Sequence, residues 1–255
     1  MRSRPRQSPA ATARPSTHTS GHSLPTTTER IVLIHAAVGD SRMWDRQAQL
    51  LRARGREVVT PDLRGFGEAP VPDAGFSNVD DVAQFLPAAL VGNSLGGRVA
   101  LETALAHPAD VDTLVLVSPA LADHDWSDEI KDYWRREEEL FERGDVDAAT
   151  QLTLDAFALP HVHDTLEPMV RRSYELQSGP EPEVSWPERR PLGSLRPRTL
   201  VLVGEHDLAD FHAIAERIVR EAPDARLEVV PGAKHVPSLE QPEAFEALVF
   251  AFLDG

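Results

Sequence analysis

The sequence predicts an α/β fold in which helices flank a mostly parallel central sheet and an inserted helical cap interrupts the core. Short apolar runs alternate with helical patterns along most of the chain, which is typical of strands joined by helical crossovers. Residues 121–195 break this alternation, because they contain helical patterns without a strand-like run between them. A chain of 255 residues is long enough for one sizeable core with such an insertion.

The first predicted elements lie between residues 31 and 60. The apolar run 31–34 predicts a strand, and the pattern over 43–54, closed by Gly55, predicts a helix. A second strand is expected at 58–60. Runs that are apolar on both faces suit strands covered by helices on both sides. The remaining expected strands are 89–91, 114–117, 200–203 and 227–230.

Three further helices follow strand-like runs. Helix-compatible residues over 98–106 follow Gly97 and end before Pro108, which stops a helix. Over 210–221, apolar residues recur at the spacing of one helix face. The last helix is expected over 242–253, with Pro242 in its first turn. The stretch 80–91 is compressed, since Pro87 nearly abuts the next strand, so only a truncated helix fits there.

The predicted organisation has three parts. They are a disordered tail at 1–29, a core formed by 30–120 and 196–255, and the helical cap at 121–195. The tail is rich in Ser, Thr, Pro and Arg and lacks an apolar period. It also lacks the apolar region of a secretory signal, so a cytoplasmic protein is expected, with organellar targeting as the alternative.

Composition disfavours several classes of function. The chain has no cysteine, which removes thiol nucleophiles, Cys-ligated zinc and disulfides. The net charge is −15, and residues 1–28 contribute +4, so the rest of the chain carries −19 and a nucleic-acid partner is not expected. No run approaches the roughly 18 apolar residues of a membrane span. The sequence leaves the oligomeric state open.

No cofactor or metal is expected. The chain lacks a G-x-G-x-x-G motif and a phosphate-binding loop, so a nucleotide cofactor is not implied. His161, His163 and Asp164 are close in sequence, but a metal site needs a further placed ligand and supporting contacts.

The most informative motif is Gly92-Asn93-Ser94-Leu95-Gly96, which lies between an expected strand and an expected helix. This G-x-S-x-G pattern in a strand–turn–helix context predicts a nucleophile elbow, in which a sharp turn exposes the serine hydroxyl. The glycines leave room for the strained backbone of that turn. Ser94 is therefore the predicted nucleophile.

A serine nucleophile needs a base within hydrogen-bond reach and a third group that orients the base. Asp207 follows the expected strand 200–203, and His235 follows 227–230. The order Ser94, Asp207, His235 is that of α/β-hydrolase triads. Asp210 is the alternative acid, although an acidic residue there also suits the start of the following helix.

The chain resembles the α/β-hydrolase superfamily over residues 30–254, and in particular small serine esterases and 3-oxoadipate-type enol-lactonases with a helical cap. The resemblance rests on the elbow and on three further segments. These are the loop His35-Ala36-Ala37-Val38-Gly39, the turn Asp62-Leu63-Arg64-Gly65-Phe66-Gly67, and His235 followed by Pro237 and by Leu239-Glu240-Gln241-Pro242. Two departures are Ala36, where the family usually has glycine, and the lack of a pattern for an opening antiparallel hairpin before Ile31.

The resemblance implies an assignment of roles. Ser94 is the nucleophile, His235 the general base and then acid, and Asp207 the orienting carboxylate. The backbone N–H groups of Ala37 and Leu95 form the oxyanion hole. The residues expected in the substrate pocket are His35, Trp126, Trp134 and Phe157.

The activity implied is hydrolysis of a small-molecule carboxylic ester or lactone through an acyl-enzyme, without a cofactor. A serine at the nucleophile position disfavours the dehalogenase and epoxide hydrolase branches, which use aspartate there. Thioester cleavage, cofactor-free hydrolysis of a C–C bond and perhydrolysis use the same triad and stay as alternatives. A non-catalytic ligand-binding member of the fold is a further alternative, because a fold alone does not determine function.

Overall fold

The computed structural model describes residues 30–179 and 182–255 and is built around a six-stranded sheet. The strand order is β2-β1-β3-β4-β5-β6, and every neighbouring pair runs parallel. The strands are β1 (Arg30–Ile34), β2 (Glu57–Val59), β3 (Ala89–Asn93), β4 (Thr113–Val117), β5 (Arg198–Gly204) and β6 (Ala225–Val230). The predicted fold class is confirmed, and the tail predicted at 1–29 lies outside the described residues.

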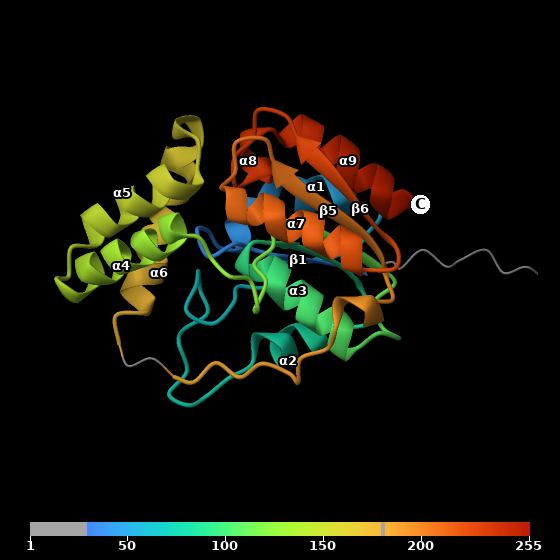
Figure 1. The fold of residues 1–255 in the computed structure, drawn as a ribbon, viewed down its shortest axis with the longest axis horizontal. Coiled ribbons are helices and arrows are strands. Elements are labelled where there is room, and N and C mark those ends of the chain that lie inside the picture. The colour runs from blue at the N-terminus through green and yellow to red at the C-terminus, as the bar shows by residue number, and fades with distance from the viewer. Residues whose placement is uncertain (1–29, 180–181) are drawn as a thin grey trace, which may run out of the picture.

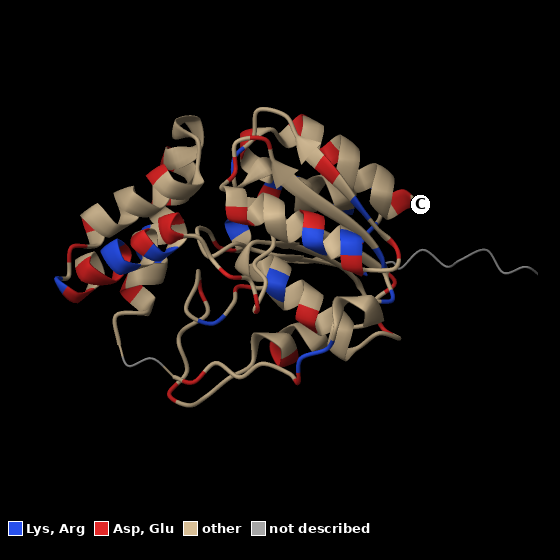
Figure 2. Ribbon diagram, in the orientation of Figure 1, with Lys and Arg blue, Asp and Glu red and all other residues tan. Residues whose placement is uncertain are grey.

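Helices surround this sheet (Figure 1). They are α1 (Asp45–Ala53), α2 (Asn78–Ala83), α3 (Leu95–Ala106), α7 (Ala209–Glu221), α8 (Pro237–Glu240) and α9 (Pro242–Asp254). Every residue of β3 and β4 is buried, as expected for strands covered on both faces. Charged residues lie mainly on the helices and connecting loops (Figure 2). Within the described ranges, no helix combines the length and apolar character needed to cross a bilayer.

Two elements differ in detail from the sequence prediction. The helix expected over 43–54 starts as a 3-10 turn, η1 (Ser41–Trp44), and continues as α1. The reason is local, because the Asp40 carboxylate accepts a hydrogen bond from the Arg42 backbone N–H and caps a tight first turn. The expectation of a truncated helix before β3 is met by α2, which has only six residues.

Three helices lie between β4 and β5 in the sequence, and we call them the α4–α6 segment. They are α4 (Asp128–Glu142), α5 (Val146–Phe157) and α6 (His163–Leu176), with the short turn η2 (Pro160–Val162) between the last two. Figure 1 shows them packed together at one end of the sheet. Another short turn, η3 (Leu192–Ser194), precedes β5. The boundaries 121–195 of the predicted cap stay a prediction.

Candidate active site

Ser94 lies at the turn between β3 and α3, in a backbone conformation that few residues adopt. Its φ is 54° and its ψ is −111°, which is a strained geometry for a residue with a side chain. The neighbouring glycines are required by close backbone contacts. A Cβ at Gly92 would lie 2.2 Å from the Gly96 carbonyl oxygen, and one at Gly96 would lie 2.3 Å from the Ile34 carbonyl oxygen. The turn therefore needs these glycines, as the motif indicates.

His235 and Asp207 form a buried hydrogen-bonded pair. Asp207 follows β5 and His235 follows β6, and His235 Nδ1 lies 3.0 Å from both carboxylate oxygens of Asp207. One of these oxygens also accepts the Leu208 backbone N–H at 2.9 Å. The imidazole packs against the rings of Phe211 and Phe157, with centroids at 4.3 and 5.0 Å. The ring is thus fixed in orientation, and its Nδ1–H is committed to the carboxylate.

Asp210, the alternative acid, has different partners. Its carboxylate accepts hydrogen bonds from the Ser127 hydroxyl at 2.6 Å, the Ser127 backbone N–H at 2.8 Å and His124 Nε2 at 2.9 Å. It therefore ties α7 to the N-terminus of α4. Of the two candidate acids, Asp207 is the one bonded to His235.

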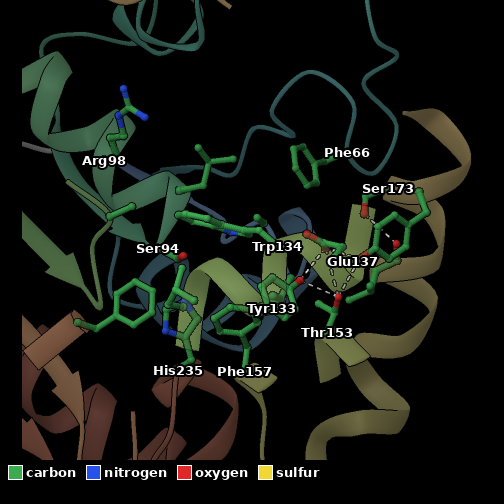
Figure 3. Close-up of a pocket in the computed structure, with 18 of the residues that line it drawn as sticks. Phe66, Ser94, Arg98, Tyr133, Trp134, Glu137, Thr153, Phe157, Ser173 and His235 are labelled. Atoms are coloured by element: carbon green, nitrogen blue, oxygen red, sulfur yellow. Dashed lines mark hydrogen bonds between the residues drawn. The ribbon is translucent and has the colours of Figure 1, made fainter. Parts of the chain in front are cut away.

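Ser94 and His235 line one cavity of about 350 Å³ between the sheet and the α4–α6 segment. Figure 3 shows both side chains on one side of this cavity, with aromatic rings from the segment beside them. Trp126, Trp134 and Phe157, which were expected in the pocket, line it. Ala37 and Leu95 belong to the same wall. Leu95 is the first residue of α3, where an N–H has no acceptor within the helix.

His35 does not lie in the cavity wall, which corrects the expectation for this residue. Its ring is completely buried, and its Nδ1–H donates to the Ala36 carbonyl oxygen at 2.8 Å. Its Nε2 accepts the Leu63 backbone N–H at 2.9 Å. Burial lowers the pKa of His35, in keeping with a neutral ring that must accept this bond. His35 thus connects two loops beside the site and does not face the cavity.

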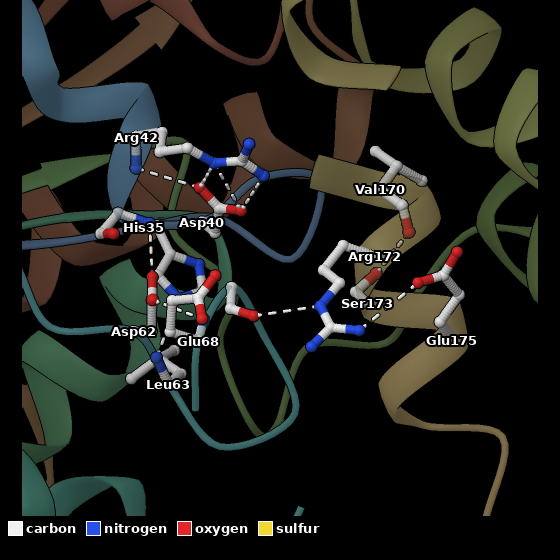
Figure 4. A network of polar contacts seen from close by, with 12 residues as sticks. His35, Asp40, Arg42, Asp62, Leu63, Glu68, Val170, Arg172, Ser173 and Glu175 are labelled. Carbon is white, nitrogen blue, oxygen red and sulfur yellow. Dashed lines mark hydrogen bonds and ion pairs between the residues drawn. The ribbon is translucent and has the colours of Figure 1, made fainter. Parts of the chain in front are cut away.

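The loops next to Ala37 are joined by polar contacts (Figure 4). Asp62 accepts the backbone N–H groups of Ser41 and Glu68, both at 2.8 Å. Burial alone would raise the pKa of Asp62, but these hydrogen bonds leave it lowered. From α6, Arg172 Nε donates to the Gly67 carbonyl oxygen at 3.4 Å. The D-x-R-G-x-G turn therefore connects the loop that carries Ala37 with the α4–α6 segment.

Glu240 is a buried residue whose role was not predicted from the sequence. Its carboxylate accepts the backbone N–H groups of Lys234 at 2.6 Å and Val236 at 3.3 Å, on either side of His235. Its other oxygen accepts the Leu159 N–H at 2.9 Å. Glu240 thus holds the His235 loop against the α4–α6 segment. The sequence feature that could have pointed to Glu240 is its position in the Leu239-Glu240-Gln241-Pro242 segment, which follows His235.

Other cavity residues were also missed by sequence reasoning. Arg98 lines the wall, and its guanidinium stacks over Trp186 at 3.7 Å. Burial lowers the pKa of Arg98. Glu137 of α4 lines the opposite part of the wall, among hydroxyl groups of three helices. Its sequence context is a run of charged residues, which alone indicates only a solvated helix face.

In the described residues, no cluster of His, Asp and Glu is arranged to hold a metal ion.

Comparison with known proteins places this geometry in a family. A model of the alpha/beta hydrolase family matches residues 31–248. The pimeloyl-[acyl-carrier protein] methyl ester esterase of Nitrosospira multiformis is 28% identical, over 87% of this chain and 93% of that protein. A shorter match to the lipase LipV of Mycobacterium tuberculosis is 37% identical and covers 36% of this chain and 38% of the lipase. The crystal structure of the enol-lactonase from Burkholderia xenovorans aligns with a TM-score of 0.73 at 21% identity, over 90% of this chain and 93% of that one.

Proposed function

The chain belongs to the alpha/beta hydrolase family, and we propose that it is a serine hydrolase that cleaves a carboxylic ester or a lactone through an acyl-enzyme. The observation that carries this proposal is the buried His235–Asp207 pair, of which His235 lines the same cavity as Ser94. The relatives named as esterase, lipase and enol-lactonase support the same chemistry. The aromatic lining of the cavity suits a small organic acyl or alcohol group.

In the proposed mechanism, Ser94 Oγ attacks the acyl carbonyl carbon while His235 Nε2 accepts the hydroxyl proton. The Asp207 carboxylate holds the Nδ1–H of His235 and stabilises the imidazolium that forms. His235 then protonates the leaving alcohol, and an acyl-enzyme remains on Ser94. Water activated by His235 hydrolyses this ester and regenerates the serine.

The developing oxyanion needs hydrogen-bond donors that are already in position. We assign this role to the backbone N–H groups of Ala37 and Leu95, which belong to the same wall as Ser94. The Leu95 N–H also lies at the positive end of the helix dipole of α3. Loss of one such donor typically costs about 3 kcal/mol of transition-state stabilisation.

The test is covalent labelling with a fluorophosphonate probe, read by intact-protein mass. We expect one adduct on the native chain and none on Ser94→Ala. Ser173→Ala is the matched control, because Ser173 lines the same cavity but donates its hydroxyl to the Val170 carbonyl oxygen. This control should label like the native chain. Ser94→Ala should also reduce ester turnover by about 10⁶-fold, as in comparable triads.

Two results would overturn the proposal. One is labelling that persists in Ser94→Ala. The other is an unlabelled native chain whose circular dichroism shows it to be folded. The second result, together with tight binding of a small ligand, would favour a non-catalytic binding protein.

A further inference from the structure

A polar cluster lies in the otherwise aromatic wall that the α4–α6 segment gives to the cavity. Oε1 of Glu137 accepts the hydroxyl of Tyr133 at 2.6 Å, that of Tyr174 at 2.5 Å and that of Thr153 at 3.5 Å. Thr153 Oγ1 is also 2.9 Å from the Tyr133 hydroxyl and 2.7 Å from the Tyr174 hydroxyl. All four residues line the cavity, and Figure 3 shows the oxygens of Tyr133, Glu137 and Thr153 gathered together.

The Glu137 carboxylate has no cationic partner in this part of the protein. Among the ion pairs of the described residues, none includes Glu137. Its hydrogen bonds within those residues all reach Oε1, which leaves Oε2 for another donor. Arg98, a cation in the same wall, stacks over Trp186 and lies on the α3 side in Figure 3. A carboxylate without a counter-ion, in the wall of a cavity lined largely by apolar and aromatic side chains, favours a ligand that supplies a positive charge.

The neighbours of Glu137 reinforce this preference. Burial raises the pKa of the Tyr133 hydroxyl and of the Tyr174 hydroxyl, and the charge of Glu137 adds to both shifts. Both phenols therefore stay protonated and remain hydrogen-bond donors to Glu137. Aromatic faces line the approach, since Trp126 and Trp134 pack edge to face at 5.4 Å and Tyr133 packs likewise on Phe157 at 4.9 Å. Such faces attract cations.

We propose that Glu137 and its hydroxyl neighbours form a subsite for a protonated primary amine of the substrate. The N–H groups of the ammonium would donate to Glu137 Oε2, and the aromatic walls would enclose the adjoining alkyl chain. One part of this inference rests on the proposed function, namely that the bound amine belongs to a substrate on which Ser94 acts. The substrate class is then an ester or lactone that carries an amino group, and anionic substrates are disfavoured at this end of the cavity.

A cluster with a purely structural role would join α4, α5 and α6 through the same hydrogen bonds. The test must therefore compare the binding of a cationic ligand with that of a neutral ligand of similar size. Binding of hexylammonium and of neutral 1-hexanol is measured by isothermal titration calorimetry. We expect the native protein to bind hexylammonium at least about tenfold more tightly, which corresponds to about 1.4 kcal/mol. Glu137→Gln keeps an acceptor for the hydroxyls but loses the charge, so it should remove most of this preference. Glu137→Asp, which keeps the charge, should retain part of it.

Glu138→Gln is the matched control, because Glu138 is the next residue of α4 and is exposed. This variant removes the same charge from the chain and should keep the native preference. Three results would overturn the inference: equal affinity of the native protein for both ligands, no binding of hexylammonium, or a preference that Glu137→Gln leaves unchanged. Equal affinity of the native protein for both ligands would overturn the inference even if a variant fails to fold.

Hydrolysis separates this inference from the proposed function. The substrates are 4-nitrophenyl 6-aminohexanoate and its neutral isostere, 4-nitrophenyl heptanoate. Glu137→Gln should lower the ratio of kcat/KM for the amino ester to kcat/KM for the neutral ester by about tenfold or more, since only the amino ester carries the charge. Ser94→Ala should abolish hydrolysis of both esters. Selective ammonium binding without hydrolysis of either ester would contradict the proposed function and leave the ammonium subsite standing.

Discussion

Two aspartates three positions apart, Asp207 and Asp210, have different partners and so support different predictions. Asp207→Asn should lower kcat for an activated ester by about 10⁴-fold, because an amide no longer holds His235 in the required tautomer. The measurement is steady-state hydrolysis of 4-nitrophenyl butyrate. KM should change little, since Asp207 does not line the cavity.

Asp210→Asn is the control for this substitution. It removes a carboxylate at a similar depth, but its partners are Ser127 and His124. Turnover of the folded variant should stay within a few-fold of native, as is usual for residues outside the reacting groups. Equal losses of kcat in the two variants would contradict the assignment of Asp207 as the orienting carboxylate.

Sequence reasoning reached some residues of the candidate site and not others, for a physical reason. Ser94, Asp207 and His235 each lie in the turn or loop that follows a strand, and in a parallel sheet such positions meet at one edge. His35 occupies a similar position, but its side chain turns into the protein toward Leu63, which sequence does not reveal. Glu137, Thr153 and Tyr174 come from three different helices, so only tertiary packing brings them together.

At the scale of elements, the strands were predictable because the residues of each strand form a pattern that can be recognised without knowing its tertiary contacts. Buried parallel strands consist of short apolar runs, and β3 and β4 contain no charged residue. The helical cap was predicted only as helical patterns, since the packing of α4 to α6 depends on contacts across the sequence. One such contact is the hydrogen bond between Tyr174 of α6 and Glu137 of α4.

Asp210 anchors the start of α4 on α7, and this contact predicts a pH-dependent stability. Burial alone would raise the pKa of Asp210, but the hydrogen bonds from Ser127 and His124 leave it lowered. A lowered folded-state pKa stabilises the fold above the unfolded-state value of about 3.9. This stabilisation is lost as the pH falls through the lower folded-state pKa.

Asp210→Asn should therefore lower the free energy of unfolding by about 1–3 kcal/mol at pH 7. The difference from the native protein should shrink as the pH falls from about 4, where the carboxylate of the unfolded chain takes up a proton, through the lower pKa of the carboxylate in the folded protein. Urea unfolding measured across this range provides the test. Asp125→Asn is the control, because Asp125 is exposed and should change little. A difference that does not vary with pH would contradict the anchoring role of the charged carboxylate.

At the scale of the whole molecule, the charge distribution bears on which ligands reach the cavity. The chain has 41 acidic residues against 26 Lys and Arg, and the charged residues lie mostly on the outer helices and loops (Figure 2). Such a surface gives a negative potential that extends beyond individual contacts. It raises the local concentration of cations and lowers that of anions, in the same sense as the charge of Glu137.

Ionic strength separates this long-range field from the local contact. The association constant of hexylammonium should fall several-fold when ionic strength rises from about 0.01 to about 0.15 M, because the Debye length shortens from about 30 to about 8 Å. Binding of 1-hexanol, which carries no charge, should not change. Glu137→Gln should bind hexylammonium more weakly at every salt concentration and keep most of the salt dependence, since the surface charge is still present. Equal salt dependence of the neutral ligand would instead indicate that salt acts on the protein itself.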